Sequence, residues 1–218
     1  MRVATWYHIY ATGAWAPAVT EHIEALSAAL LPPPMVGIVG SPEDRQICRN
    51  FLAPHGWQIA AEADEGFEQV TLNALRDWLL TEPEPCAVMY AHTKGASTDL
   101  GGANTRWRQE MTARLIGEWP VCLQLLERHD AVGCSWKNKH EFPQLLSTFE
   151  GAGIYAGNFW WARSDYLRRL PAPGSADRHD AEAWIGQGDP DVIDLLPGWM
   201  LLMAGDGSVV TAQVAEGV

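Results

Sequence analysis

The segment Tyr90-Ala91-His92-Thr93-Lys94-Gly95-Ala96-Ser97 combines residue types that suit the binding of an anion. A small glycine-containing loop can bring backbone N–H groups close to an anion. Lys94 adds a point charge suited to phosphate, and His92 and Thr93 add hydrogen-bonding groups. A tight turn with a solvated lysine explains the same composition, so composition alone leaves the two interpretations even.

Two arginines flank a tryptophan in Arg106-Trp107-Arg108, at the start of a predicted helix. Two guanidinium groups could grip a diphosphate through paired hydrogen bonds while the tryptophan packs inward. Residues two apart lie about 200° apart around a helix, however. Both arginines therefore cannot face one ligand from a regular turn, and one of them is predicted to be a surface residue.

Aromatic side chains crowd the segment Gly157-Asn158-Phe159-Trp160-Trp161-Ala162-Arg163. In a strand, alternate side chains share a face: Tyr155, Phe159 and Trp161 on one, Asn158 and Trp160 on the other. Two large aromatic faces beside Asn158 and the bare Gly157 would make a stacking wall with a polar clamp. A strand buried on both sides explains the aromatics as well, but a buried asparagine needs partners, and a sugar is one candidate.

Two carboxylates, Asp180 and Glu182, stand near the start of a predicted helix in Arg178-His179-Asp180-Ala181-Glu182-Ala183-Trp184-Ile185. Either one, beside an aromatic side chain, could act as general base towards an acceptor hydroxyl. Negative charge at the positive end of a helix explains the pair without chemistry and contributes about 0.3–1 kcal/mol. Spacing alone favours this second interpretation.

The elements that must position these residues alternate between strand and helix in the first half of the chain. Four strands are predicted, at Val3 to Tyr10, Met35 to Val39, Trp57 to Ala61 and Cys86 to Tyr90. Three helices are predicted between them: one opened by Pro17 with Val19, Ile23, Leu26 and Leu30 on its apolar face, one through Leu52, and one with Phe67, Val70, Ala74 and Trp78 on one face.

This order predicts an α/β fold with a mostly parallel, Rossmann-like sheet and helices on both faces. Ligands of such sheets bind beyond the carboxyl ends of the strands, so the loops after Tyr10, Gly40, Ala61 and Tyr90 are the first places to look. Gly13 and Gly40 do not form a GxGxxG fingerprint, which argues against a dinucleotide dehydrogenase.

The second half of the chain is less regular. Predicted helices are one capped by Asn104 with Trp107, Met111 and Leu115 on one stripe, and others at Val121 to Glu127, Ser164 to Leu170 and about Asp180 to Gln187. Predicted strands are Asp130 to Trp136 and Gly153 to Ala162. We find no repeats, and we expect one domain.

Composition excludes several classes of protein. Of 218 residues, 47% are hydrophobic and 19% are charged, which is an ordinary globular balance, and the formal net charge of −12 disfavours binding to duplex nucleic acid. The four cysteines form no paired ligand motif and are expected to be reduced thiols in a cytoplasmic protein without a zinc site. No apolar stretch reaches the roughly 20 residues needed to span a bilayer, so we expect a soluble protein.

Taken in order, four of these motifs resemble a known group of proteins. They are His92-Thr93-Lys94-Gly95, Trp107-Arg108, Gly157-Asn158-Phe159-Trp160-Trp161-Ala162-Arg163 and Ala181-Glu182-Ala183-Trp184. Together they resemble small bacterial and viral glycosyltransferase-like proteins and, more distantly, the rhamnan-synthesis family. The resemblance covers the motifs from Cys86 to Ile185. It implies a GT-A-like single domain over residues 1–218, with a nucleotide-binding half (1–100) and an acceptor half (101–218).

The resemblance also implies roles for individual residues. Many GT-A enzymes hold a divalent metal with an Asp-x-Asp motif where this chain has His92-Thr93-Lys94, and a lysine can neutralise the diphosphate directly. No metal ligand is therefore assigned, although the nearby Asp99 keeps Mn or Mg compatible with the loop. Arg108 is the better arginine for the diphosphate. The Glu182 region falls where inverting enzymes place the catalytic base.

The leading hypothesis is glycosyl transfer from a nucleoside diphosphate sugar. His92, Thr93, Lys94 and Arg108 would bind the donor and stabilise the leaving diphosphate, while Asn158, Trp160 and Trp161 would shape the sugar or acceptor site. Glu182 or Asp180 would deprotonate the acceptor hydroxyl, which could belong to a glycan, a lipid-linked saccharide, a protein or a modified nucleoside. A non-catalytic nucleotide- or carbohydrate-binding module is the alternative. A phosphate-ester hydrolase comes last, because the chain has neither a clear carboxylate metal cluster nor a nucleophile elbow.

Overall fold

The computed structural model describes residues 1–94, 102–140, 151–174, 178–197, 199–203 and 209–213. Its first half contains four parallel strands, which are β1 (Arg2–Tyr10), β2 (Met35–Val39), β3 (Gln58–Ala63) and β4 (Cys86–His92). They lie in the order β3-β2-β1-β4. Each is a short run of mainly apolar residues bounded by proline, glycine or polar residues, and all four were predicted from that pattern.

The helices of the first half are α1 (Trp15–Ala28), α2 (Pro42–Leu52), which continues into a 3-10 turn (Ala53–His55), and α3 (Gln69–Thr81). At the start of α2, the Ser41 hydroxyl accepts a hydrogen bond from the Asp44 N–H at 3.1 Å, and Pro42 occupies the first helical position. The predicted apolar face of α3 is only partly correct, because Ala74 and Trp78 of that face pack against the core but are only partly buried. Its buried apolar side chains are Leu72, Leu75 and Leu79, whereas Phe67 is exposed.

Two overlapping apolar stripes on α3 explain this error. Both stripes follow the helical period, and packing against the sheet decides which one is covered. The leucine stripe packs into the core, and Trp78 lies at its margin, where its ring centroid is 5.8 Å from that of Trp6.

Three further strands complete a seven-stranded sheet in the order β3-β2-β1-β4-β8-β5-β9. These are β5 (Ala131–Gly133), β8 (Trp160–Arg163) and β9 (Val192–Asp194). β8 runs antiparallel to both of its neighbours, and β5 pairs with β9 in parallel. The mostly parallel α/β sheet predicted from the sequence is confirmed.

Both long strands predicted in the second half are broken into two. Residues 130–136 give β5 and the start of β6 (Trp136–Asn138), and residues 153–162 give β7 (Gly153–Tyr155) and β8. β6 and β7 form a separate antiparallel pair. Ser135, Gly157 and Asn158 have positive φ, and a left-handed residue cannot continue a flat strand.

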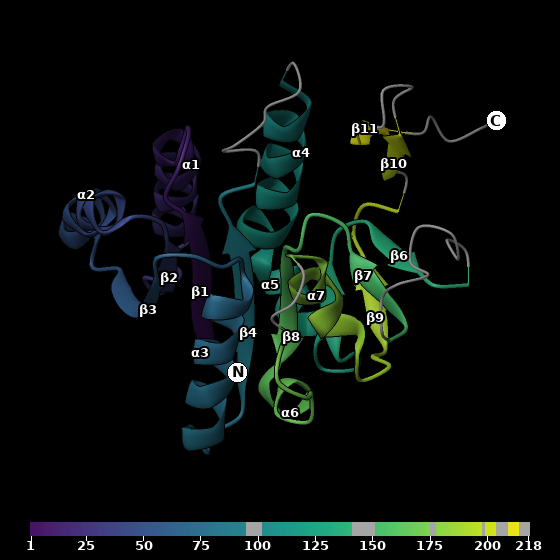
Figure 1. The fold of residues 1–218 in the computed structure, drawn as a ribbon. Coiled ribbons are helices and arrows are strands. Elements are labelled where there is room, and N and C mark those ends of the chain that lie inside the picture. The colour runs from purple at the N-terminus through teal and green to yellow at the C-terminus, as the bar shows by residue number, and fades with distance from the viewer. Residues whose placement is uncertain (95–101, 141–150, 175–177, 198, 204–208, 214–218) are drawn as a thin grey trace.

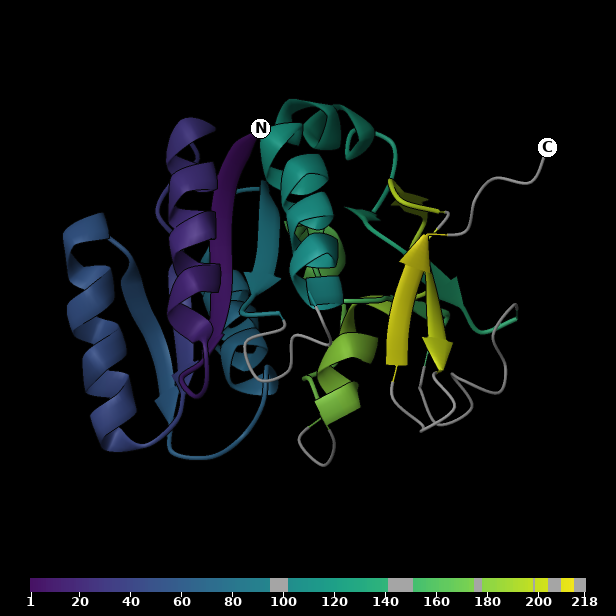
Figure 2. The same ribbon diagram turned by 90° about the horizontal axis from the view of Figure 1, so that it is seen from above.

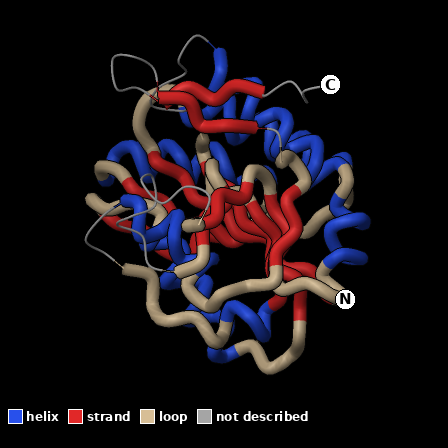
Figure 3. Tube along the Cα trace, turned by 90° about the vertical axis from the view of Figure 1, so that its right-hand side faces the viewer, coloured by secondary structure: helices blue, strands red, loops and turns tan. Residues whose placement is uncertain are grey.

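The remaining strands, β10 (Trp199–Met203) and β11 (Val209–Gln213), form an antiparallel ribbon apart from the central sheet (Figure 3). The helices of this half are α4 (Ala103–Thr112) with a π-helical continuation (Ala113–Gly117), α5 (Trp119–Leu125), α6 (Ser164–Leu167) and α7 (Arg178–Ala183) with a 3-10 turn (Trp184–Gly186). Gly102, with φ of 85°, precedes α4, so Asn104 lies inside that helix and does not cap it. Within the described residues, no helix is long and apolar enough to cross a membrane.

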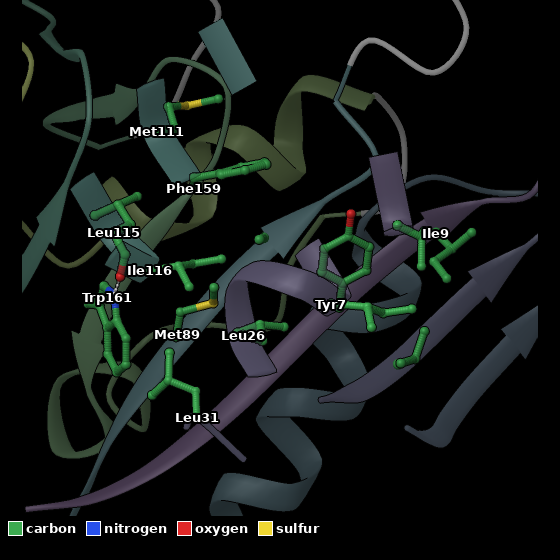
Figure 4. Close-up of a cluster of buried hydrophobic side chains, with 14 of the residues drawn as sticks. Tyr7, Ile9, Leu26, Leu31, Met89, Met111, Leu115, Ile116, Phe159 and Trp161 are labelled. Carbon is green, nitrogen blue, oxygen red and sulfur yellow. Dashed lines mark hydrogen bonds between the residues drawn. The ribbon is translucent and has the colours of Figure 1, made fainter. Parts of the chain in front are cut away.

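Helices cover both faces of the sheet (Figures 1 and 2). α1, α2, α4 and α5 pack on one face, and α3, α6 and α7 on the other. Figure 4 shows part of the core on the first face, where Tyr7 and Met89 from the sheet meet Leu26 of α1 and Leu115 beyond α4. The core on the second face is rich in aromatic rings, among them the stacked pair Tyr90 and Trp160, with centroids 5.1 Å apart.

A chain of buried hydrogen bonds ties β1 to α1 and α4 within the first core. The Thr112 hydroxyl donates to the Arg108 carbonyl at 2.8 Å, so it accepts a hydrogen bond from His22 Nε2 at 2.9 Å. His22 Nδ1 then accepts from the Tyr7 hydroxyl at 2.6 Å. This arrangement holds a neutral imidazole, and burial lowers the pKa of His22 to about 3.

These shifts predict a loss of stability in acid. Burial lowers the pKa of His8 to about 4, so His8 and His22 both bind protons in the unfolded chain before they do so in the folded one. The contribution of the two neutral histidines to the free energy of unfolding is complete above the unfolded pKa of about 6.5. It falls as the pH drops towards 4 and 3, by at most about 1.4 kcal/mol per pH unit for each histidine.

Urea unfolding of the parent and His22→Gln between pH 7 and 5 tests this prediction. A glutamine can accept from Tyr7 and donate to Thr112 but does not titrate, so the variant is expected to show the shallower pH dependence. His55→Gln, at an exposed histidine, should leave the slope unchanged. Equal slopes for the parent and His22→Gln would contradict a neutral, buried His22.

Candidate active site

The candidate site lies where the chain reverses its direction across the sheet. β1 leads through α1 to β2 on one side, whereas its other neighbour, β4, leads on to α4. Connections that leave two adjacent strands in opposite directions create a crevice at their carboxyl ends, and open α/β sheets bind ligands there. His8 and His92 are register partners near these ends, so the predicted His92–Lys94 segment lies at the switch point.

The chain immediately after β4 is held against the end of β1. The Thr93 N–H donates to the His8 carbonyl, and the Thr93 hydroxyl accepts from the Tyr10 N–H, both at 3.1 Å. The Lys94 N–H donates to the His92 carbonyl at 2.8 Å. Gly95 to Ser97 and Asp99, named in the sequence predictions, lie outside the described residues.

The Lys94 ammonium lies 4.6 Å from the centre of the Trp107 ring. This cation–π contact places the charge over α4. Trp107 itself is buried, and no described residue accepts a hydrogen bond from its indole N–H. A cation therefore packs over a buried indole ring at the carboxyl end of β4, and within the described part of the chain the N–H of that ring has no acceptor.

Arg108 is buried beside Lys94, and Arg106 is exposed, so the prediction that one of the two arginines is a surface residue is confirmed. Arg108 donates to both carboxylate oxygens of Glu21 on α1, at 3.0 and 3.3 Å, and to the Lys94 carbonyl at 2.8 Å. In this structure Arg108 thus links α1, α4 and the Lys94 loop. To contact a diphosphate, the Arg108 guanidinium would have to replace its hydrogen bonds to Glu21 with hydrogen bonds to the phosphates.

The tryptophans of the aromatic segment do not form the predicted stacking wall. Trp160 and Trp161 are completely buried, because helices cover both faces of β8. The Trp161 indole N–H donates to the Leu115 carbonyl at 2.7 Å, and the Trp160 N–H donates to Asn158 Oδ1 at 2.8 Å. Neither indole presents a face to a ligand, which corrects their assignment to substrate binding.

Asn158 is 1% exposed and has φ of 52°. It follows Gly157, whose φ is 89°, in the turn that joins β7 to β8. Its Oδ1 accepts from Trp160, and its Nδ2 donates to Glu68 Oε2 at 2.8 Å. The hydrogen-bond partners of the buried Asn158, which the sequence alone did not identify, are therefore protein groups.

Glu68, at the start of α3, is the centre of a polar network that the sequence analysis missed. Its Oε2 also accepts from the Tyr90 hydroxyl at 2.8 Å, and its Oε1 lies 3.6 Å from His92 Nδ1. The other nitrogen of His92, Nε2, donates to the Gly157 carbonyl at 2.7 Å. The loop after the third strand had been marked as a ligand-binding position, but nothing in the sequence distinguishes Glu68 from the nearby acidic residues.

Burial and the Glu68 charge set the protonation of the groups around this network. Tyr90 lies wholly in the core, so burial, and then the nearby Glu68 carboxylate, raise the pKa of its hydroxyl and keep it a neutral donor. His8 shares a 2.7 Å hydrogen bond with Thr71, for which Gly37 leaves room, and burial lowers the pKa of His8 to about 4. Tyr90 and His8 are therefore neutral beside the Glu68 network.

Asp180 and Glu182 lie on α7, on the face of the sheet opposite to α4 (Figure 2). Both side chains are half-buried. Asp180 lies in the first turn of α7, with its carboxylate close to the backbone of Gly174, so it does not cap the helix. Within the described part of the chain, no hydrogen bond or ion pair joins Glu182 to Thr93, Lys94 or Arg108.

The turn that positions Asn158 depends on Gly157. A Cβ at this residue would lie 3.0 Å from Met111 Sδ and from Trp107 Cζ2, and its φ is one that side chains disfavour. Gly157→Ala is expected to lower the free energy of unfolding by about 1–3 kcal/mol, as measured by urea unfolding. Gly117→Ala is the control, because no atom lies within 4 Å of its added Cβ. Equal stability of the two variants would show that the turn is not constrained.

Comparisons with known proteins place the chain in a family without an assigned activity. No curated protein matches it. A solved structure from Desulfovibrio desulfuricans G20, of a protein proposed to be a nucleotide-diphospho-sugar transferase, is 12% identical over 90% of this chain and 80% of that chain. Its TM-score of 0.36 is too low to support an inference about this chain. A family model matches residues 19–188, and the chain belongs to the family described as Domain of unknown function (DUF8361).

Proposed function

We propose that this protein is a glycosyltransferase that moves a sugar from a nucleoside diphosphate sugar to an acceptor hydroxyl. The observation that carries the proposal is the position of Lys94. It lies at the topological switch point, directly after β4, and its ammonium packs over the ring of the buried Trp107. A nucleotide bound at the carboxyl ends of β1 and β4 would bring its phosphates to this cation.

The chemistry that we propose is a single displacement. The acceptor oxygen attacks the anomeric carbon while the bond from that carbon to the diphosphate oxygen breaks, and the bonding electron pair leaves with the diphosphate. Lys94 would stabilise the charge that develops on the leaving group. Arg108 orients the loop by holding the Lys94 carbonyl. Glu182 would accept the acceptor's proton, and inversion at the anomeric carbon would follow.

The described residues at the end of β4 do not fit a Mn²⁺ or Mg²⁺ site. These ions prefer oxygen ligands, whereas this position offers an ammonium at Lys94 and a hydroxyl at Thr93 that already accepts a hydrogen bond from Tyr10. No group of three potential metal-binding side chains occurs among the described residues. The proposed displacement therefore relies on Lys94 rather than on a metal ion.

We further propose that the chain works as one domain in a reducing compartment such as the cytoplasm. All four cysteines are buried free thiols, as expected where disulfides do not form. The acceptor is left open among a glycan, a lipid-linked saccharide, a protein and a modified nucleoside. Binding without turnover in every acceptor assay would instead favour a nucleotide- or carbohydrate-binding module.

Lys94→Ala tests the donor site. Removal of the ammonium should weaken UDP, GDP or dTDP binding by about 10- to 100-fold and change binding of the corresponding nucleoside less than about 2-fold, because only the diphosphate carries the charge. Isothermal titration calorimetry measures both. Arg128→Ala removes one exposed positive charge elsewhere and should affect neither ligand. Equal losses for nucleotide and nucleoside would place Lys94 away from the phosphates.

Glu182→Gln tests the catalytic assignment. The substitution should preserve folding and donor binding while lowering the transfer rate by roughly 100-fold, a usual contribution of a general base. Asp180→Ala is the companion variant. It should lower the melting temperature, because Asp180 lies in the first turn of α7 against the backbone of Gly174, and leave most activity in the folded protein. Transfer at the parent rate by Glu182→Gln would remove Glu182 from the mechanism and make Asp180 the next residue to test.

A further inference from the structure

Glu68 is a half-buried carboxylate that uses one oxygen for structure and leaves the other available. Its Oε2 accepts hydrogen bonds from Tyr90 and Asn158, both at 2.8 Å. Its Oε1 accepts no hydrogen bond from the described residues and lies 3.6 Å from His92 Nδ1. The side chains of Glu68 and His92 are each 13% exposed, so a small ligand group could reach them.

The structural contacts of Glu68 do not require a negative charge. A glutamine at this position could accept both hydrogen bonds through its single amide oxygen. A partly buried carboxylate oxygen without a hydrogen bond is costly, and among the described residues Oε1 has only the long 3.6 Å pairing with His92 Nδ1. The next residue, Gln69, is also buried, and its Oε1 has no hydrogen-bond partner among the described residues. Acceptor capacity in excess of the available donors thus gathers at the start of α3.

The surroundings hold this carboxylate in a single orientation. Tyr90 approaches it from β4, and Asn158 approaches from the turn after β7. Trp160 fixes the amide of Asn158 through its indole N–H. His92 flanks Oε1, and its own ring is held by the Gly157 carbonyl and by a T-shaped contact with the Phe159 ring, whose centroid is 5.3 Å away.

We propose that Glu68 Oε1 accepts a hydrogen bond from a hydroxyl of the donor sugar and that Glu68 is therefore a substrate-binding residue. The proposal rests on the proposed function, since it assumes that the diphosphate lies at Lys94. Lys94 is two residues beyond His92, and the sugar is attached directly to the diphosphate. A sugar on this side of the diphosphate meets His92 and Glu68 first. A charged acceptor and a hydroxyl donor form one of the stronger hydrogen bonds available to a carbohydrate.

The consequence is selectivity for the glycosyl part of the donor. A parent protein that uses Glu68 should bind a nucleoside diphosphate sugar more tightly than the nucleoside diphosphate alone. Loss of the carboxylate should remove that difference and leave the nucleotide contacts intact. If the role of Glu68 were purely structural, its replacement would weaken the binding of both ligands equally and would lower the melting temperature.

Calorimetry with three matched pairs tests the proposal: UDP and UDP-glucose, GDP and GDP-mannose, dTDP and dTDP-glucose. We consider the pair for which the parent most prefers the sugar nucleotide. Glu68→Gln should weaken binding of that sugar nucleotide by about 10- to 100-fold and binding of the nucleotide alone by less than about 2-fold. Glu65→Gln, at an exposed carboxylate in the loop before α3, should behave as the parent. An unchanged preference in Glu68→Gln overturns the proposal.

The same titrations separate this proposal from the proposed function. Binding of none of the six ligands by the parent would overturn both. Binding of nucleotides with no preference for any sugar would leave the nucleotide site standing and overturn the role of Glu68. If Glu68→Gln fails to fold, Glu68→Asp replaces it. That variant keeps the charge but draws the carboxylate back by one methylene, so it should lose the same preference.

Discussion

The pairing of β1 with β4 is the constraint on which the rest of this structure depends. It brings β4, and with it the start of the loop that leads to α4, against the first strand, and it makes His8 and His92 neighbours. α1 and α4 pack on the same face of the sheet, one on each side of the switch point. The bonds of Thr93 to the end of β1 and of Arg108 to Glu21 both follow from this one pairing.

The side chains that link the elements around the switch point are polar, and most of them are buried. Arg108 and His22 on one face, and Tyr90 and Asn158 on the other, each have a hydrogen-bonded partner. An apolar core would give more stability than such a network. Removal of one partner would leave the other buried and unsatisfied, so the networks are stable only when complete. Open α/β sheets bind ligands at the carboxyl ends of their strands, and polar groups concentrated at that edge here favour a functional rather than a structural origin.

The positions of the four parallel strands in the first half could be predicted from the sequence, because each is a short apolar run between prolines, glycines and polar residues, whereas β9 was not predicted. That prediction also placed His92 and Lys94 at a strand end, where open α/β sheets bind ligands. Glu68 could not be found in the same way. Its partners Tyr90 and Asn158 are 22 and 90 residues away, and neither periodicity nor local composition reports such a contact. Trp160 and Trp161 lie on opposite faces of the strand, as the alternation predicted, but alternation does not reveal that helices cover both faces.

The aromatic segment therefore acts through packing rather than by touching a ligand. Trp160 lies in the core, but its indole N–H orients the Asn158 amide, and that amide in turn orients Glu68. Gly157 can approach Trp107 only because it lacks a side chain, and its carbonyl holds His92. Each residue type in Gly157-Asn158-Phe159-Trp160 is thus required by a neighbour rather than by a substrate. Because Gly157 touches Trp107, beneath Lys94, while Asn158 holds Glu68, this one turn couples the cation on one face of the sheet to the carboxylate on the other.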